Sequence, residues 1–224
     1  MTAAQKQELE SSGRVWFRRA IDAGTLDKIA EASDVGNRPG IRINREDEIA
    51  ALFGPDTLLG AFLDDIGLNH RPVRLLAFNK SERANWAVPW HQDRVIAVSH
   101  KAEVSGYHNW VSKAGFWHCE PPLDLLRDMV FARVHIDPST AANGALEIAA
   151  GSHRFDRVAA ADASSIAKQC SVEVCEAEPG DVLLVKALAL HRSSSAQVAS
   201  PRRTLRADFA PRSALAAPLQ WAMP

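Results

Sequence analysis

The spacing of apolar residues divides the chain into a helical first third and a strand-rich remainder. Leu26, Ile29 and Ala30 share one face at helical spacing. A second segment repeats that spacing in Leu58, Leu59, Phe62, Leu63 and Ile66. Residues that suit helix ends flank both segments: Gly24-Thr25 and Asp56-Thr57 at the starts, and Gly67 at the second end. We therefore predict a helical N-terminal part over about residues 1–71.

From Pro72 onward, short apolar or alternating runs stand between turn residues, which is the pattern of β-strands. These runs cover residues 73–78, 86–98, 130–136, 145–149, 172–174, 182–185 and 205–209. Pro179-Gly180-Asp181 predicts a turn before the sixth run, and Asn143-Gly144 predicts a hairpin turn. The pattern favours a β-rich core over about residues 72–210, within a single domain that spans residues 1–224.

One stretch between two predicted strands, Ser99 to Pro122, shows no regular pattern. Loops of this length in compact domains are often functional. Its aromatic side chains make disorder less attractive than a lid over a site: Tyr107, Trp110, Phe116 and Trp117. His118 and Glu120 in the same stretch suit an exposed polar loop as well as a contact with substrate.

The charge balance points away from polyanionic partners. The chain carries 26 Lys plus Arg against 27 Asp plus Glu, a formal net charge of −1, so no global field attracts nucleic acid. No apolar run approaches the roughly 18 residues of a membrane span, and the polar start lacks the parts of a signal peptide. We expect a cytoplasmic protein with a small-molecule partner. Three cysteines, an odd number, argue against a disulfide framework or a zinc knuckle.

The first chemistry-bearing motif is His91-Gln92-Asp93. In a strand, residues two apart point to one face, so an imidazole and a carboxylate could hold one metal ion there. A second histidine would complete the two-histidine, one-carboxylate set of non-haem iron(II) oxygenases. The motif alone is weak, because His-x-Asp occurs by chance in many proteins.

About 100 residues later, the segment 181–190 leads into His191, and Pro201-Arg202-Arg203 leads into the alternating residues 204–209 of the next predicted strand. If these strands pair, a histidine and an arginine can face one cavity, where a guanidinium suits the carboxylate of a bound diacid. The competing interpretation makes His191 a core histidine and Arg202 a surface charge. The earlier motif favours the functional interpretation of both.

Taken in order, several blocks of sequence resemble the phytanoyl-CoA dioxygenase-like family of iron(II)- and 2-oxoglutarate-dependent oxygenases. They are Trp90-His91-Gln92-Asp93, Asn143-Gly144-Ala145-Leu146, Gly151-Ser152-His153-Arg154, Gly180-Asp181-Val182, His191-Arg192-Ser193 and Pro201-Arg202. The resemblance spans about Val73 to Phe209. The ordered set is far more specific than any single block.

The resemblance implies a mainly β fold with flanking helices, a double-stranded β-helix of the jelly-roll, cupin-like type. It makes His91, Asp93 and His191 the metal and catalytic ligands for Fe(II), and Arg202 the anchor for the distal carboxylate of 2-oxoglutarate. Ser193 and Thr204 are weaker candidates for binding the cosubstrate, because each lies two residues from His191 or Arg202 and could share its face.

Other polar residues admit plainer interpretations. Arg133 and His135 alternate in the predicted strand 130–136, so they could face substrate or form a buried structural pair. Gly151-Ser152-His153 suits a turn after a strand. We predict that Arg203, Arg206 and Arg212 belong to a solvated face.

The reaction implied by the family uses O₂ and 2-oxoglutarate, releases succinate and CO₂, and oxidises a small organic substrate. Asp93 favours hydroxylation or another oxidation over halogenation, because the related halogenases carry a small residue at the carboxylate position. Two alternatives stay open: a jelly-roll metalloprotein of other chemistry, which Arg202 speaks against, and a non-catalytic small-molecule binding protein, which the intact ligand set speaks against.

Overall fold

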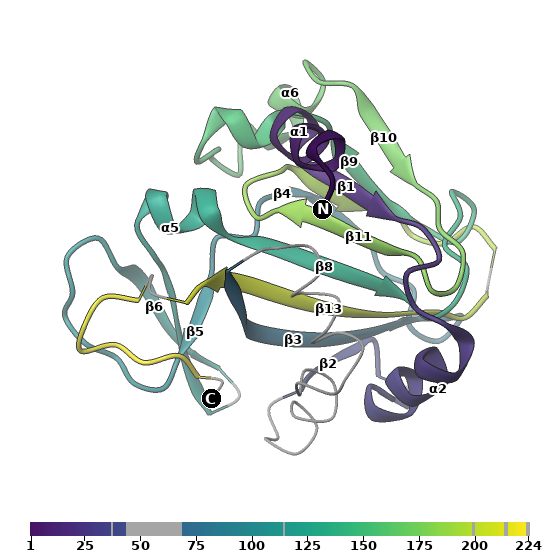
Figure 1. The fold of residues 1–224 in the computed structure, drawn as a ribbon, viewed down its shortest axis with the longest axis horizontal. Helices are drawn as coiled ribbons and strands as arrows, with labels where there is room; N and C mark the ends of the chain where they lie inside the picture. Colours follow the sequence, from purple (N-terminus) through teal and green to yellow (C-terminus); the bar gives the residue numbers. More distant parts are fainter. Residues whose placement is uncertain (37, 44–68, 114, 199, 213–214, 223–224) are drawn as a thin grey trace.

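The computed structural model describes residues 1–36, 38–43, 69–113, 115–198, 200–212 and 215–222 (Figure 1). Its helices are α1 (Ala3–Ser12), α2 (Ala23–Ala32), α5 (Leu123–Asp128), α6 (Ala163–Ala167) and the short 3-10 helix η1 (Ser152–Phe155). Strands in the first half are β1 (Arg14–Phe17), β2 (Gly40–Ile43), β3 (His70–Lys80), β4 (Val88–His91), β5 (Ile96–Val98), β6 (His108–Lys113) and β7 (Phe116–Glu120). Those in the second half are β8 (Val130–His135), β9 (Leu146–Ala149), β10 (Val172–Cys175), β11 (Val182–Lys186), β12 (His191–Ser193) and β13 (Arg202–Pro211). No helix in the described ranges is long and apolar enough to cross a membrane.

Two antiparallel sheets form the body of the protein. The larger sheet has the strand order β1-β11-β8-β13-β3-β2, and the smaller one has the order β10-β9-β12-β4. Phe131, Leu183 and Val185 of the larger sheet pack with Leu146 and Ile148 of the smaller sheet in one apolar cluster. The predicted fold class, a mainly β jelly roll with flanking helices, is confirmed.

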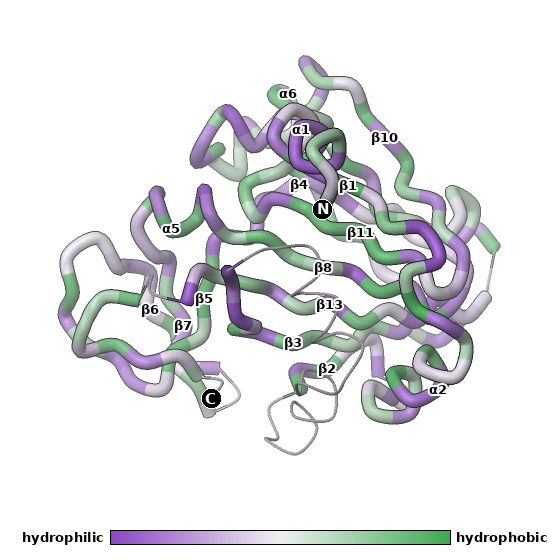
Figure 2. Tube along the Cα trace, viewed as in Figure 1, coloured by the Kyte–Doolittle hydropathy of each residue, from purple (hydrophilic) through white to green (hydrophobic). Residues whose placement is uncertain are grey.

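Strand alternation gives the larger sheet two different faces. In β8, Val130, Ala132 and Val134 belong to the apolar cluster that also contains Leu9 of α1 and Leu26 of α2. The residues between them point toward the smaller sheet. All six residues of β8 are therefore buried, and the central strands β8 and β11 are largely apolar along their length (Figure 2).

The prediction of a helical first third is correct for α1 and α2, but it missed two strands among the residues described there. Strand β1 pairs with β11 at one edge of the larger sheet, and β2 pairs with β3 at the other. Four-residue strands carry too little pattern to be separated from neighbouring helices by spacing alone. Helix α2 does lie where its apolar face predicts it, although it starts at Ala23, because the Asp22 side chain accepts a hydrogen bond from the Thr25 backbone N–H. The second predicted helix lies outside the described residues.

The stretch from Ser99 to Pro122 is also more regular than predicted. Strands β6 and β7 form a hairpin that joins β5 in a third sheet with the order β5-β7-β6. Tyr107, Trp110 and Trp117 pack in an apolar cluster with residues of α5. These contacts argue against a flexible lid.

Of the two predicted turns, one needs correction. Asn143-Gly144 turns the chain, but the strands on either side, β8 and β9, lie in different sheets, so it is no hairpin. Pro179-Gly180-Asp181 makes a turn directly before β11, as predicted. Gly180 has φ +85°, and a Cβ atom there would lie 2.4 Å from the backbone oxygen of Ile21. This turn therefore fits closely against the segment between β1 and α2.

Asp181 ties that segment to the sheet. The side chain, 2 % exposed, accepts hydrogen bonds from the backbone N–H groups of Arg19 and Glu178 and forms an ion pair with Arg18. Burial alone would raise the pKa of Asp181, but these donors lower it below its ordinary value. The ionised form therefore stabilises the fold.

We expect Asp181→Asn to lower the free energy of unfolding at pH 7 by about 1.5–3 kcal/mol, the range for hydrogen bonds to charged groups. Because the folded-state pKa is depressed, the contribution is present above the unfolded pKa and is lost as pH falls through the folded one. Urea unfolding at several pH values measures both effects. Asp27→Asn, on the exposed face of α2, is the control and should change little. An equal effect of the two substitutions would contradict this role.

Candidate metal and cosubstrate site

The three predicted ligands lie together between the two sheets. His91 ends β4 and His191 begins β12, and the two residues pair directly across these antiparallel strands. Asp93 follows two residues after β4. One potential ligand atom from each of the three side chains lies within 4.8 Å of the others. The His191 Nε2 atom lies 3.0 Å from Asp93 Oδ2, so the set can converge on one ion.

Backbone hydrogen bonds orient both imidazole rings. The Nδ1 atom of His91 lies 2.9 Å from the Pro89 carbonyl oxygen, and that of His191 lies 2.9 Å from the Ala189 carbonyl oxygen. Donation from Nδ1–H to each carbonyl leaves Nε2 with its lone pair free, as metal ligation requires. Burial and the neighbouring His191 lower the pKa of His91, which favours the neutral, ligating form.

Arg206 holds the carboxylate of Asp93, and its predicted place on a solvated face is wrong. The side chain is buried, and its Nη1 atom lies 2.6 Å from Asp93 Oδ2. Its guanidinium also lies over the ring of Phe131, 4.0 Å from the centroid. Burial would raise the pKa of Asp93, but Arg206 and His191 lower it well below its usual range. Asp93 is therefore ionised at neutral pH.

A second buried carboxylate, Asp208, balances the arginines around Asp93. It forms ion pairs with Arg206 and with Arg74, and Arg74 also lies 3.7 Å from Asp93. Strand alternation explains the arrangement, since residues 206 and 208 share the inner face of β13 and residue 74 faces inward from β3. The network of buried side chains holds the half-buried Asp93 in position.

A pocket of about 210 Å³ contains the three candidate ligands. Its wall includes Arg202, which is 2 % exposed and whose Nε and Nη1 atoms have no hydrogen-bond partner in the described part of the chain. Arg133 lines the same pocket and also has an unpartnered Nε. Burial lowers the pKa of Arg202 to about 10, so the guanidinium is still charged at neutral pH. A buried cation without a carboxylate partner is costly, which suits a site for an anionic ligand.

The remaining predicted cosubstrate residues differ in their access to this pocket. Ser193 lines it, donates a hydrogen bond to the Gly144 carbonyl oxygen and lies 3.1 Å from Lys80 Nζ. Thr204 is fully buried on β13, but it is not among the residues that line the pocket.

Lys80 faces Arg202 across β3 and β13, and burial together with Arg202 lowers its pKa to about 8. Lys80 was missed by the sequence reasoning.

Comparison with known proteins agrees with the family resemblance found in the sequence. A family model described as phytanoyl-CoA dioxygenase matches residues 15–204. The chain belongs to this family. The resemblance found in the sequence is thereby confirmed, and iron(II) and 2-oxoglutarate are the cofactor and cosubstrate of the phytanoyl-CoA dioxygenase family. A comparison with curated protein sequences found no match.

Solved structures share the fold at low identity. EctD from S. alaskensis, crystallised with 2-oxoglutarate and 5-hydroxyectoine, is 15% identical, with a TM-score of 0.68 over 94% of this chain and 76% of EctD. HygX from Streptomyces hygroscopicus with iron bound is 14% identical, with a TM-score of 0.64 over 95% and 88% of the two chains. SnoN, an alpha-ketoglutarate-dependent epimerase from nogalamycin biosynthesis, is 14% identical, with a TM-score of 0.63 over 99% and 91%.

Other polar residues of the family-like segment lie away from solvent or away from the pocket. His118 and Glu120 are buried, so of their two interpretations the exposed polar loop does not hold for either. Glu120 forms an ion pair with Arg157. Arg203 points to the opposite face of β13 from Arg202 and pairs with Asp137 through two side-chain hydrogen bonds. His135 is buried against Trp16 and is absent from the residues that line the pocket.

Proposed function

We propose that this protein is an iron(II)- and 2-oxoglutarate-dependent dioxygenase that hydroxylates a small organic substrate and releases succinate and CO₂. His91, Asp93 and His191 would bind the iron, and Arg202 would bind the distal carboxylate of 2-oxoglutarate. The single observation that carries the proposal is the convergence of these four side chains on one pocket, with Arg202 lacking a described carboxylate partner.

The residues present fit both groups. Two imidazoles with free Nε2 atoms and one carboxylate match the ligand set of non-haem iron(II) oxygenases, and they would leave room on the metal for cosubstrate and O₂. The orphaned guanidinium of Arg202 in the same pocket supports a ligand with an acidic end. Ser193, which lines the pocket, can contribute a hydroxyl group beside that end, and Thr204 is a more distant candidate.

Bound iron supplies the activation of O₂ that couples decarboxylation of 2-oxoglutarate to oxidation of a substrate C–H bond. The protein itself orients the reactants. Arg206 holds Asp93 in its ligating position, and the backbone carbonyls of residues 89 and 189 fix the two imidazoles. The half-buried side chains of Phe78 and Trp86 line the pocket and would help to exclude water once substrate is bound.

An aspartate at position 93 supports hydroxylation over halogenation, because it occupies the iron position that a halide would need. The proposal of hydroxylation rests on Asp93 and not on the fold, since similar structures include an epimerase. Hydroxylation is therefore the proposed reaction, and insertion of an oxygen atom into the product is its defining outcome.

The experiment is a screen of small organic molecules with iron(II), 2-oxoglutarate and O₂. We expect at least one compound to raise succinate formation at least about tenfold over the substrate-free rate, with a product heavier by one oxygen atom in the mass spectrum. Incorporation of label from ¹⁸O₂ checks the source of that atom. A coupled product that has lost hydrogen without gaining oxygen would replace hydroxylation by another oxidation.

A further inference from the structure

A second pocket adjoins the metal pocket and extends to β2, the edge strand of the larger sheet. It has a volume of about 460 Å³, and it shares Leu76, Phe78 and Trp86 with the metal pocket. Its other lining residues are Pro39, Gly40, Ile41, Arg42 and Lys113. The shared side chains make the two spaces neighbours, and a volume of this size suits a small organic molecule.

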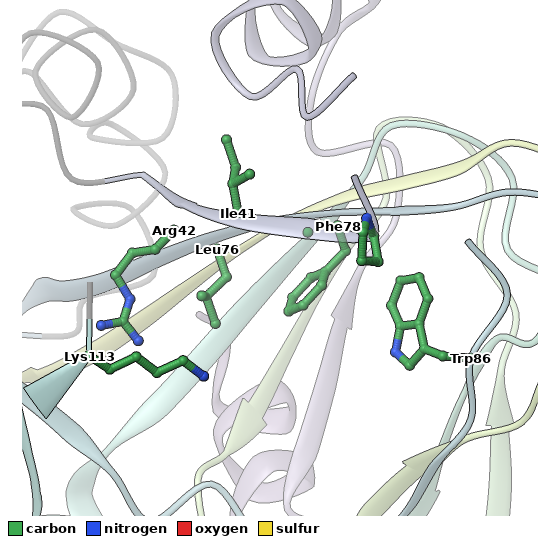
Figure 3. Close-up of a pocket in the computed structure, with 8 residues that line it drawn as sticks. Ile41, Arg42, Leu76, Phe78, Trp86 and Lys113 are labelled. Carbon is green, nitrogen blue, oxygen red and sulfur yellow. The ribbon is translucent and has the colours of Figure 1, made fainter. Parts of the chain in front are cut away.

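The larger pocket has an apolar end and a cationic end. Figure 3 shows Phe78 and Trp86 at one end, Leu76 in between, and the charged tips of Arg42 and Lys113 on the opposite side. Both charged residues that line it are cations. The lining therefore combines an aromatic surface for an apolar body with positive charge for an acidic group.

Arg42 differs from the arginines that serve the fold. Arg203 pairs with Asp137, Arg157 with Glu120, and Arg192 with Glu147. Within the described ranges, Arg42 has no carboxylate at ion-pair distance, and its Nε atom is buried without a hydrogen-bond partner. Arg202, the proposed anchor of the cosubstrate, shares this property. An arginine held this way keeps its charge available for a ligand.

A neutral histidine orients Arg42 instead of an acid. The Nη1 atom of Arg42 contacts Nε2 of the buried His118. Burial, together with Arg42 and Arg74, lowers the pKa of His118 to about 4. His118 is therefore uncharged at neutral pH and accepts a hydrogen bond from Arg42 without neutralising it. Burial and Arg74 lower the pKa of Arg42 to about 10, so the guanidinium stays protonated.

We infer that this second pocket binds the substrate and that the substrate is an amphipathic organic anion, with its acidic group on Arg42 and Lys113 and its apolar body against Phe78 and Trp86. The inference rests on the proposed function, because it places this molecule beside the iron ligands. Neutral analogues would lose the ion pair, and cationic analogues would be repelled.

The sheet register sets the distance between the acidic group and the reacting carbon. Leu76 on β3 pairs with Arg42 of β2 on one side and with Arg206 of β13 on the other. Arg42 and Arg206 therefore stand two strand spacings apart, roughly 10 Å, and Arg206 contacts Asp93. A substrate that lies across Leu76 would carry its acidic group several bonds from the carbon that is oxidised.

Binding of four probes tests the inference without knowledge of the true substrate. The probes are 4-phenylbutanoate, 4-phenylbutyl phosphate, 4-phenylbutanol and 4-phenylbutylamine, titrated calorimetrically into anaerobic protein saturated with iron(II) and 2-oxoglutarate. We expect an acidic probe to bind at least about tenfold more tightly than the alcohol, and the amine to bind most weakly. Whether the carboxylate or the phosphate binds better identifies the acidic group.

Substitution of Arg42 tests whether the cationic end of the pocket causes the preference for acidic probes. Arg42→Met should weaken binding of the acidic probe about tenfold and leave binding of the alcohol unchanged, which also shows that the variant is folded. Arg42→Lys should keep part of the preference. Arg38→Met, an exposed arginine four residues earlier that is not part of the pocket lining, is the control and should behave like the parent protein.

The inference is overturned if acid and alcohol bind equally, if no probe binds at millimolar concentration, or if Arg42→Met and Arg38→Met have the same effect. Repeating the titrations without iron and 2-oxoglutarate separates this failure from failure of the proposed function. An Arg42-dependent preference for acids in protein that does not bind 2-oxoglutarate would leave the pocket assignment standing and remove the oxygenase assignment.

Discussion

Alanine at any one of the three proposed ligands should abolish substrate-coupled formation of succinate. Each of His91→Ala, Asp93→Ala and His191→Ala removes one of three protein ligands from a set whose atoms lie within 4.8 Å of one another. Two remaining ligands would hold iron weakly and in the wrong geometry. Succinate production with the substrate found in the screen measures the loss, and the iron content of the purified variants measures its cause.

The three losses should not add, because each substitution already removes the function of the whole set. Asp208→Asn is not a suitable control, since Asp208 supports Arg206 behind Asp93. A better control is His153→Ala, a histidine of the family-like segment whose Nε2 atom lies 3.1 Å from the Glu10 carbonyl oxygen, away from the pocket. Near-parental activity of any one ligand variant would remove that residue from the set.

Replacement of Arg202 by lysine should raise the concentration of 2-oxoglutarate required for half-maximal activity by about 30-fold or more. Loss of one partner of a buried, hydrogen-bonded charge pair costs about 2–5 kcal/mol, and tenfold corresponds to about 1.4 kcal/mol. Lysine keeps the charge but lacks the planar fork that pairs with a carboxylate through two hydrogen bonds. Iron binding should change little, because Arg202 is not one of the ligands.

Arg203→Lys is the matched control for this prediction. Arg203, the neighbour of Arg202 on β13, points to the opposite face and pairs with Asp137. Its replacement should therefore leave the 2-oxoglutarate requirement near the parental value. Kinetics over a range of 2-oxoglutarate concentrations compares the two variants. An increase for Arg203→Lys without one for Arg202→Lys would assign the anchor to the other face of the strand.

The sequence was sufficient to predict the strand-rich core, because its strands are long or strongly apolar. Strand β11, for example, is an apolar run preceded by the turn at Gly180. Strands β1 and β2 were not predicted. Both β1 and β2 have four residues, and their pairing with β11 and β3 is decided by contacts distant in sequence that spacing does not show.

Some residues of the candidate site could likewise be predicted from the sequence, and others could not. His91, Asp93, His191 and Arg202 could be selected because each belongs to an ordered motif. Arg206 was assigned to solvent, although the even spacing that selected Thr204 from Arg202 also reaches Arg206 on the same face. Arg42 could not have been selected, because the role proposed for it depends on the pairing of β2 with β3 and on the contact with His118.

The most direct measurement is an anaerobic titration of metal-free protein with iron(II) and then with 2-oxoglutarate, followed by visible absorption. We predict one equivalent of each at saturation, with a new absorption band that appears only when both are present, since a 2-oxo acid must chelate the bound metal to give it. Asp93→Ala and Arg202→Lys should weaken the band at the same concentrations. Binding of 2-oxoglutarate that is independent of iron, with no band in the parent protein, would contradict the assignment of this pocket as an iron(II) and 2-oxoglutarate site.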